Sequence, residues 1–203
     1  MTRERLPICS GPPCAAYALL AALLLGGCAR APAPTLYLLD SPREPVPPAA
    51  DAGPVIGLAP LDLPSYLDRP QIVARAGAHR IDASEQHLWA EPLARGAARV
   101  LTASLSAALG SNRVYRLPRR HPLALDWRVE IDIDRFDGAL DQTVTLAARW
   151  SLFRAAERDA RLTRVTHLDE AVTAPGHAGL VAAQTAALRR LGETIAAAIA
   201  AAH

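Results

Sequence analysis

Two stretches in the second half of the chain alternate apolar and polar residues with the two-residue period of a β-strand. In residues 127–134 the apolar positions run from Trp127 to Ile133 and are separated by charged residues. Residues 143–152 alternate in the same way. Because successive side chains of a strand point to opposite faces, both stretches predict strands with one buried and one solvated face.

Shorter apolar runs, bounded by Gly, Pro or polar turn residues, have the composition of further strands. Two of these runs flank Gly77 and predict a tight hairpin, and Asp137-Gly138 is expected to form a turn. We expect these shorter strands at residues 55–61, 71–76, 80–83 and 114–117, and a further strand in the Thr-rich stretch at 162–172.

Two longer segments instead repeat apolar residues three and four positions apart, which is typical of an amphipathic helix packed on a core. The first covers residues 93–109, with Pro92 suited to its first turn and Gly110 to its end. The second covers residues 179–201. Two long amphipathic helices covering a mixed β-sheet of about five strands predict a three-layer α/β fold.

The amino terminus has the pattern of a bacterial secretion signal. Two arginines precede an apolar run at residues 15–25, which is shorter than the about 20 residues that a membrane-spanning helix needs. The run leads into a Leu-Gly-Gly-Cys motif that ends at Cys28 and resembles the lipobox of bacterial lipoproteins. In that pattern the chain is cleaved before Cys28, whose thiol carries diacylglycerol. Cys9 and Cys14 fall in the predicted leader, so Cys28 has no cysteine partner in the mature chain.

Three regions follow from this pattern: a lipoprotein signal peptide at 1–27, a lipidated Cys28 with a Pro-rich tether at 28–53, and a folded domain at 54–203. Six prolines between residues 32 and 48 block helices and favour an extended tether. Within it, residues 35–39 are an apolar island expected to add an edge strand or to pack on the domain. The alternative is an ordinary secreted protein whose leader happens to contain a cysteine.

Composition narrows the class of partner. Apolar residues make up 51% of the chain and aromatic residues 4%, which indicates a packed core that is mainly aliphatic. The formal net charge is only +2, so a broad basic surface for nucleic acid is not expected.

No convergent set of catalytic or metal-binding groups is evident in the sequence. No two histidines have the i, i+4 spacing of a helical metal pair, and Asp132 and Asp134 lie between arginines on what reads as a solvated strand face. We therefore expect a protein that is not an enzyme and holds no metal or cofactor. A periplasmic hydrolase would need Ser84 or Ser104 beside a histidine and a carboxylate. We expect each of the six histidines to be a surface or packing residue; they are His79, His87, His121, His167, His177 and His203.

One segment concentrates aromatic, acidic and basic residues between two prolines. In a structural interpretation, Tyr66 and Leu67 cap the core while Asp68 and Arg69 brace the loop by charge-assisted hydrogen bonds. In a functional interpretation, the same loop contacts a partner, because Tyr and Arg are favoured at interfaces. The sequence does not decide between the structural and the functional interpretation of this loop. Downstream, Trp89 is positioned to pack as a hydrophobic staple at the start of the first helix.

These segments carry a resemblance to a known family. The sequence LPSYLDRPQIVAR, followed by WAEPL and a long helix and later by DIDRFDG, resembles the PqiC family of ABC-type transport auxiliary lipoproteins. The resemblance extends from the lipobox to the last helix. Its signature residues, which the resemblance marks as partner-binding or structural, are Tyr66, Leu67, Asp68, Arg69, Pro70, Gln71, Trp89 and Pro92.

The resemblance implies a fold similar to the amino-terminal domain of TolB and a role beside transporters of the mammalian-cell-entry (MCE) type. Such systems join an inner-membrane permease and ATPase to a periplasmic MCE protein and move phospholipid or other hydrophobic molecules between the two membranes. The auxiliary lipoprotein is expected at the periplasmic face of the outer membrane, where it forms a homo-oligomeric ring. Ala29, in place of an Asp after Cys28, agrees with outer-membrane sorting. The alternative function is a periplasmic scaffold lipoprotein that stabilises another outer-membrane assembly.

Overall fold

The structure is a computed structural model that describes residues 33–40, 53–155 and 157–202. All of its helices and strands belong to the unit Pro34–His203. Cys28, the whole predicted signal peptide and most of the predicted tether lie outside the described residues.

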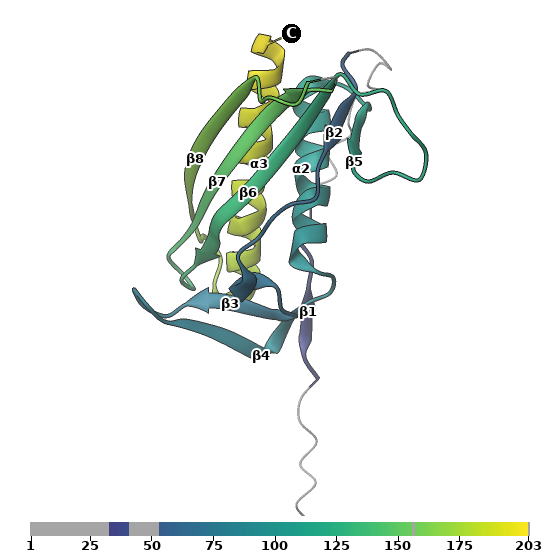
Figure 1. The fold of residues 1–203 in the computed structure, drawn as a ribbon. Helices are drawn as coiled ribbons and strands as arrows, with labels where there is room; N and C mark the ends of the chain where they lie inside the picture. The colour runs from purple at the N-terminus through teal and green to yellow at the C-terminus, as the bar shows by residue number, and fades with distance from the viewer. Residues whose placement is uncertain (1–32, 41–52, 156, 203) are drawn as a thin grey trace, which may run out of the picture. The chain divides into compact units, whose positions relative to one another are not determined.

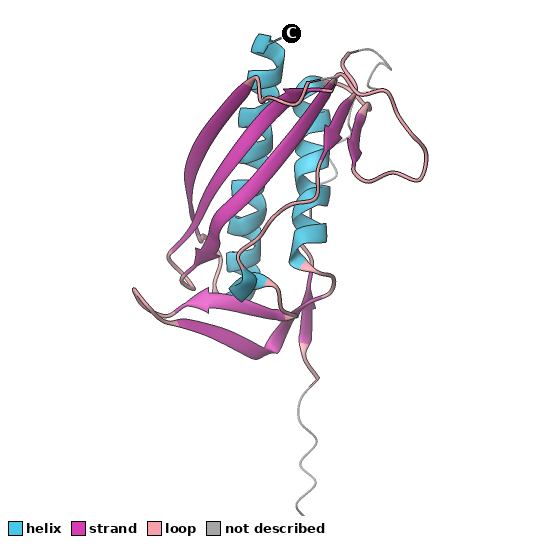
Figure 2. Ribbon diagram, in the orientation of Figure 1, coloured by secondary structure: helices cyan, strands magenta, loops and turns pink. Residues whose placement is uncertain are grey.

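The larger sheet has five strands in the order β5-β2-β6-β7-β8 (Figure 2). Its long strands are β6 (Trp127–Gly138), β7 (Thr143–Arg154) and β8 (Leu162–Ala171), which pair antiparallel. The short strand β2 (Ile56–Leu58) lies parallel to both β6 and β5 (Val114–Arg116). The sheet is therefore mixed and has five strands, as the apolar patterns predict.

Two helices, α2 (Leu93–Leu109) and α3 (Gly176–Ala202), run side by side across one face of this sheet (Figure 1). Gly110 ends α2 in a left-handed conformation with a φ of 58°, which glycine adopts without steric cost. The helices approach closely where Gly192 of α3 faces Ser104 of α2, since a Cβ at Gly192 would lie 2.7 Å from the Ser104 Cβ. The predicted α/β class with two long covering helices is confirmed.

A second sheet of three strands has the order β1-β4-β3 and packs near one end of the molecule's long strands (Figure 1). Strand β3 (Gln71–Arg75) and strand β4 (Ile81–Trp89) form the predicted hairpin. Strand β1 (Thr35–Tyr37) adds to β4 in parallel, and Leu39 just beyond it is 1% exposed in the core. Part of the segment that the proline pattern assigns to a tether is thus built into the fold.

Several predicted boundaries were wrong by a few residues; for example, the strand expected at 55–61 ends at Leu58, and the helix expected from residue 179 begins at Gly176. Strand β4 continues from residue 83 to Trp89, because its second half pairs with β1, which is distant in sequence. Pro92 is the residue before α2 and not part of its first turn. Asp137 and Gly138 are the last residues of β6, and the turn follows at residues 139–142.

Among the described residues, no helix combines the length and hydropathy that crossing a bilayer requires.

Candidate functional site

Strand β6 contains a β-bulge, where the pairing with β7 shifts between Ile133 and Arg135. Up to Ile133 the odd-numbered residues face the core, whereas beyond the bulge Phe136 is the fully buried core residue. An extra residue in one strand reverses which positions face each side. The side chains of Arg135 and Asp137 therefore point away from the helices, towards the second sheet.

Asp137 is fully buried there and accepts hydrogen bonds from three side chains. The Tyr66 hydroxyl donates at 2.7 Å, and Arg75 donates through Nε at 2.9 Å and Nη2 at 2.6 Å. Arg135, on the same strand, donates through Nε at 3.0 Å. One carboxylate thus joins the 3-10 helix η1 (Ser65–Leu67), strand β3 and strand β6.

Two ionisation equilibria are shifted by this cluster. Burial alone would raise the pKa of Asp137, but the hydrogen bonds from Arg75, Tyr66 and Arg135 outweigh it and lower the pKa to about 2. Burial and the hydrogen bond to Asp137 raise the pKa of Tyr66 to about 12. Tyr66 is therefore a neutral donor to a permanently charged acceptor across the physiological range.

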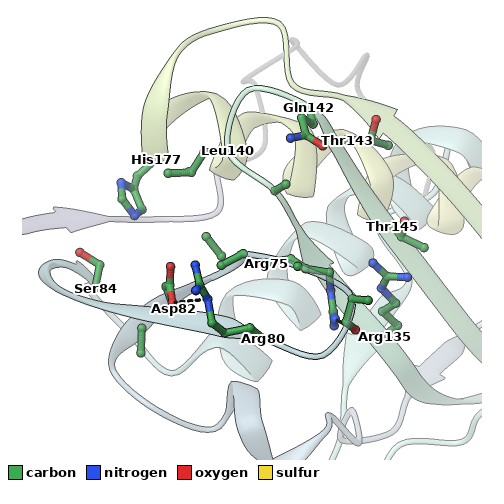
Figure 3. Close-up of a pocket in the computed structure, with 16 residues that line it drawn as sticks. Arg75, Arg80, Asp82, Ser84, Arg135, Leu140, Gln142, Thr143, Thr145 and His177 are labelled. Atoms are coloured by element: carbon green, nitrogen blue, oxygen red, sulfur yellow. Dashed lines mark hydrogen bonds and ion pairs between the residues drawn. The ribbon is translucent and has the colours of Figure 1, made fainter.

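Beside the cluster, an open cleft of about 890 Å³ separates the β3–β4 hairpin from the ends of β6 and β7. Arg75, Arg80 and Asp82 line one wall and Arg135 the other (Figure 3). Each of these arginines forms an ion pair with a carboxylate. Arg75 and Arg135 pair with Asp137, and Arg80 pairs with Asp82 at 3.6 Å. The charges along this cleft are therefore largely compensated within the chain.

The loop between Pro64 and Pro70, here called the signature loop, has a buried part and an exposed part in the structure. Tyr66 bonds to Asp137 and Leu67 is 3% exposed, so both anchor the loop to the core as the structural interpretation predicts. The bracing predicted for Asp68 and Arg69 is wrong. Both side chains are exposed, and neither forms a hydrogen bond or an ion pair with any residue that the structure describes.

The two signature segments meet in a shallow groove of about 340 Å³. The backbone N–H of Trp89 donates to the carbonyl of Pro70 at 2.7 Å, and Gln71 pairs with Leu88 in the β3–β4 ladder. This pairing brings residues 68–70 beside residues 89–93, which include Pro92. Trp89 is 8% exposed and packs into the core at the end of strand β4. The N-cap of α2 is Pro92, so Trp89 lies three residues before the cap and not at the position of a hydrophobic staple.

A histidine pair connects the second sheet to α3. The rings of His87 on β4 and His177 on α3 stack with their centroids 3.8 Å apart. The hydroxyl of Tyr37 on β1 lies 2.9 Å from His87 Nδ1. Burial, and then the neighbouring His87, lowers the pKa of His177. Together with Tyr37, the two histidines form a packing contact between β1, β4 and α3, in keeping with the packing role expected for the histidines.

Neither serine that a hydrolase would need is hydrogen bonded to a histidine that the structure describes. Ser104 donates to the Val100 carbonyl at 2.9 Å within α2, and Ser84 accepts from the backbone N–H of Gln86 at 3.3 Å. Asp132 and Asp134 are exposed, as predicted for a solvated strand face. In the described parts of the chain, no group of three or more His, Cys, Asp or Glu side chains is placed to hold a metal ion.

Sequence reasoning missed Asp137, Arg75 and Arg135 as site residues. The signal was present, since the alternation of β6 breaks at Arg135 and an apolar Phe136 falls on the position expected to be polar. The Asp137-Gly138 sequence has the composition of a tight turn, so it predicts an exposed turn and not a buried carboxylate at the end of a strand.

Two crystal structures share the fold. An uncharacterised protein superposes with a TM-score of 0.66 at 20% sequence identity, covering 83% of this chain and 99% of its own. A protein from Xanthomonas campestris superposes with a TM-score of 0.60 at 18% identity, covering 81% of this chain and 90% of its own. No curated protein matches the sequence.

A family model assigns the chain more directly. The model for the ABC-type transport auxiliary lipoprotein component matches residues 37–196, from β1 almost to the end of α3. The match includes the signature loop, the Asp137 cluster and both helices, which is more than half of the chain. The chain therefore belongs to the family of ABC-type transport auxiliary lipoprotein components.

Proposed function

We propose that this protein is a non-catalytic auxiliary subunit of an MCE-type ABC transport system that moves phospholipid or other hydrophobic molecules between the inner and outer membranes. In this proposal lipids on Cys28 hold the domain at the periplasmic face of the outer membrane. There it assembles into a homo-oligomeric ring and receives the periplasmic MCE protein. Membership of the ABC-type auxiliary family supports the transport context, and the resemblance to the PqiC family supports the MCE partner.

The observation that carries the proposal is the groove built from both signature segments. Asp68 and Arg69 are exposed at its rim and have no partner within the described chain. Their backbone is held by η1, by buried Leu67 and by the Tyr66–Asp137 hydrogen bond. Unpaired charges on a rigid base beside a buried tryptophan resemble an interface whose specificity comes from charge complementarity. We assign this groove to docking of the transporter.

A pull-down from bacterial membranes tests the docking role. Tagged full-length protein is expected to recover the MCE protein together with the permease and ATPase. The double variant Asp68→Ala/Arg69→Ala should recover about tenfold less, because losing two interfacial charges removes roughly 1–2 kcal/mol of binding free energy. The matched control is Arg80→Ala/Asp82→Ala, an exposed pair of the same composition on the neighbouring hairpin.

Failure to recover any MCE protein or ATPase with the unaltered chain would reject the proposed function. Equal losses in both double variants would reject the groove as the docking site. The scaffold alternative predicts recovery of a different outer-membrane assembly and an unchanged phospholipid distribution after deletion of the gene.

A further inference from the structure

A second cleft, of about 780 Å³, lies between helix α2 and strand β5. Its floor is apolar, because Ala94 and Ala98 of α2 face Val114 and Leu117 at the β5 side. Its volume falls within the range of clefts that bind small molecules, roughly 300–1,000 Å³. An apolar surface of this kind favours a ligand with a hydrocarbon part.

Three arginines, Arg95, Arg116 and Arg119, also line this cleft, and none of its lining residues is acidic. All three are exposed, and none forms an ion pair or side-chain hydrogen bond with a residue in the described ranges. Arg119 instead lies over the Tyr115 ring, with its Cζ 4.3 Å from the centroid. In the cleft beside Asp137, by contrast, every arginine forms an ion pair with a carboxylate.

Three uncompensated guanidinium groups around one cleft create a positive potential that attracts an anion. Guanidinium groups donate paired, parallel hydrogen bonds that match the oxygens of phosphate. A ligand that satisfies both the arginines and the apolar floor must join an anionic head to a hydrocarbon tail.

We propose that the α2–β5 cleft is a binding site for a phosphate-bearing lipid, with its headgroup at the three arginines and its acyl part on the apolar floor. The inference deepens the proposed function and rests on it for the source of the lipid, since a lipid transporter would deliver one to this protein. An acidic peptide fits less well. Strand β5 has only three residues, so an added peptide strand would gain few main-chain hydrogen bonds.

Photo-cross-linking of the full-length protein in bacterial cells grown with radioactive phosphate tests the site. Tyr115 is replaced with p-benzoylphenylalanine, which inserts into nearby C–H bonds under ultraviolet light. Free inorganic phosphate has no C–H bond, and the diacylglycerol on Cys28 contains no phosphorus, so neither can label the protein. After nuclease treatment, a light-dependent radioactive adduct identified by mass spectrometry as a phospholipid is the expected result.

Phe153 provides a matched control position, because it also carries a stacked arginine, Arg128, with its Cζ 4.5 Å from the ring centroid. Phe153 does not line the α2–β5 cleft. Labelling at Tyr115 should exceed labelling at Phe153. Equal labelling at both positions would show general contact with the bilayer and overturn the proposal, as would an adduct that is a peptide.

Two kinds of variant separate the headgroup contacts from the apolar floor. Arg95→Gln/Arg116→Gln/Arg119→Gln should reduce labelling about tenfold or more, because it removes the three charged donors to the phosphate. Its control is the triple Arg149→Gln/Arg158→Gln/Arg164→Gln, which changes the net charge equally at three exposed positions outside the cleft.

Ala98→Trp should reduce labelling by filling the floor, with protein level and membrane association compared in parallel. Unchanged labelling in both the arginine triple and the filled cleft would overturn the proposal. Recovery of the transporter in the pull-down, with no adduct at Tyr115, would reject the lipid site and leave the proposed function standing.

Discussion

Asp137 shows how one buried charge can hold two sheets together. A carboxylate without water needs several donors, and this one has four hydrogen bonds from Tyr66, Arg75 and Arg135. Because the donors come from η1, β3 and β6, the cluster fixes the signature loop against the larger sheet. The exposed Asp68 and Arg69 next to it are therefore presented on a rigid support.

Replacing this carboxylate should destabilise the fold in a pH-dependent way. Asp137→Asn is expected to lower the free energy of unfolding by about 3 kcal/mol at pH 7, because it leaves partly buried Arg75 without its counter-ion. The folded pKa lies near 2, below the ordinary value of 3.8. The contribution of the charge is therefore fully present above about pH 5 and is lost as the pH falls through 4 towards 2.

Urea denaturation at pH 7 and pH 3 measures both effects. The unaltered chain should lose stability between these values, and Asp137→Asn should lose less. Asp134→Asn, at an exposed position of the same strand, is the control and should behave like the unaltered chain at both. A variant at Asp137 as stable as this control would contradict the proposed role of the cluster.

Among the elements, those with a local repeat could be predicted from the sequence. Strands β6 and β7 and both helices have periodic apolar positions, and their buried residues lie where the patterns place them. The second sheet could not be derived in full, because β1 and β4 pair residues about 50 positions apart. The bulge in β6 left one signal in the sequence, the apolar Phe136 at a position expected to be polar, but which side chains it turns towards the second sheet depends on the pairing with β7. Asp137 was missed because Asp137-Gly138 has the composition of a tight turn, whereas the signature loop was found from its composition.

The incorporation of β1 predicts a difference between two adjacent leucines. Leu39 is 1% exposed, and its carbonyl accepts a hydrogen bond from Arg99 of α2 at 2.7 Å, whereas Leu38 is 51% exposed. Leu39→Ala should lower the free energy of unfolding by about 3 kcal/mol through lost burial and a cavity. Leu38→Ala should change it by less than about 0.5 kcal/mol.

Chemical denaturation of both variants checks this prediction. Equal, small effects would mean that the residues before 53 do not belong to the cooperative fold. They would then act as the simple tether that the proline pattern suggests.

For the whole molecule, the proposed function depends on where the chain is held. Cys28 lies outside the described residues, and its lipidation stays a prediction from the lipobox pattern and is consistent with a lipoprotein family. The anchor would place the groove and the α2–β5 cleft of every subunit at the same membrane.

Cys28→Ala removes the predicted acceptor of the lipids. The variant should incorporate no radioactive palmitate and should accumulate as an uncleaved or mislocalised form, because the thiol is the site of both modification and recognition by the signal peptidase. Metabolic labelling followed by membrane fractionation measures this. Normal processing and outer-membrane fractionation of Cys28→Ala would refute the lipoprotein assignment.

The position of β1 limits the distance between the proposed lipid anchor at Cys28 and the folded domain. Thr35, the first residue of β1, is only seven residues beyond Cys28, and seven extended residues reach at most about 25 Å. A Pro-rich tether that continued to residue 53 would span more than twice that distance. Under the proposed function, so short a tether would keep the lipidated domain close to the surface of the outer membrane, and an inner-membrane partner would have to bridge the periplasm to contact it.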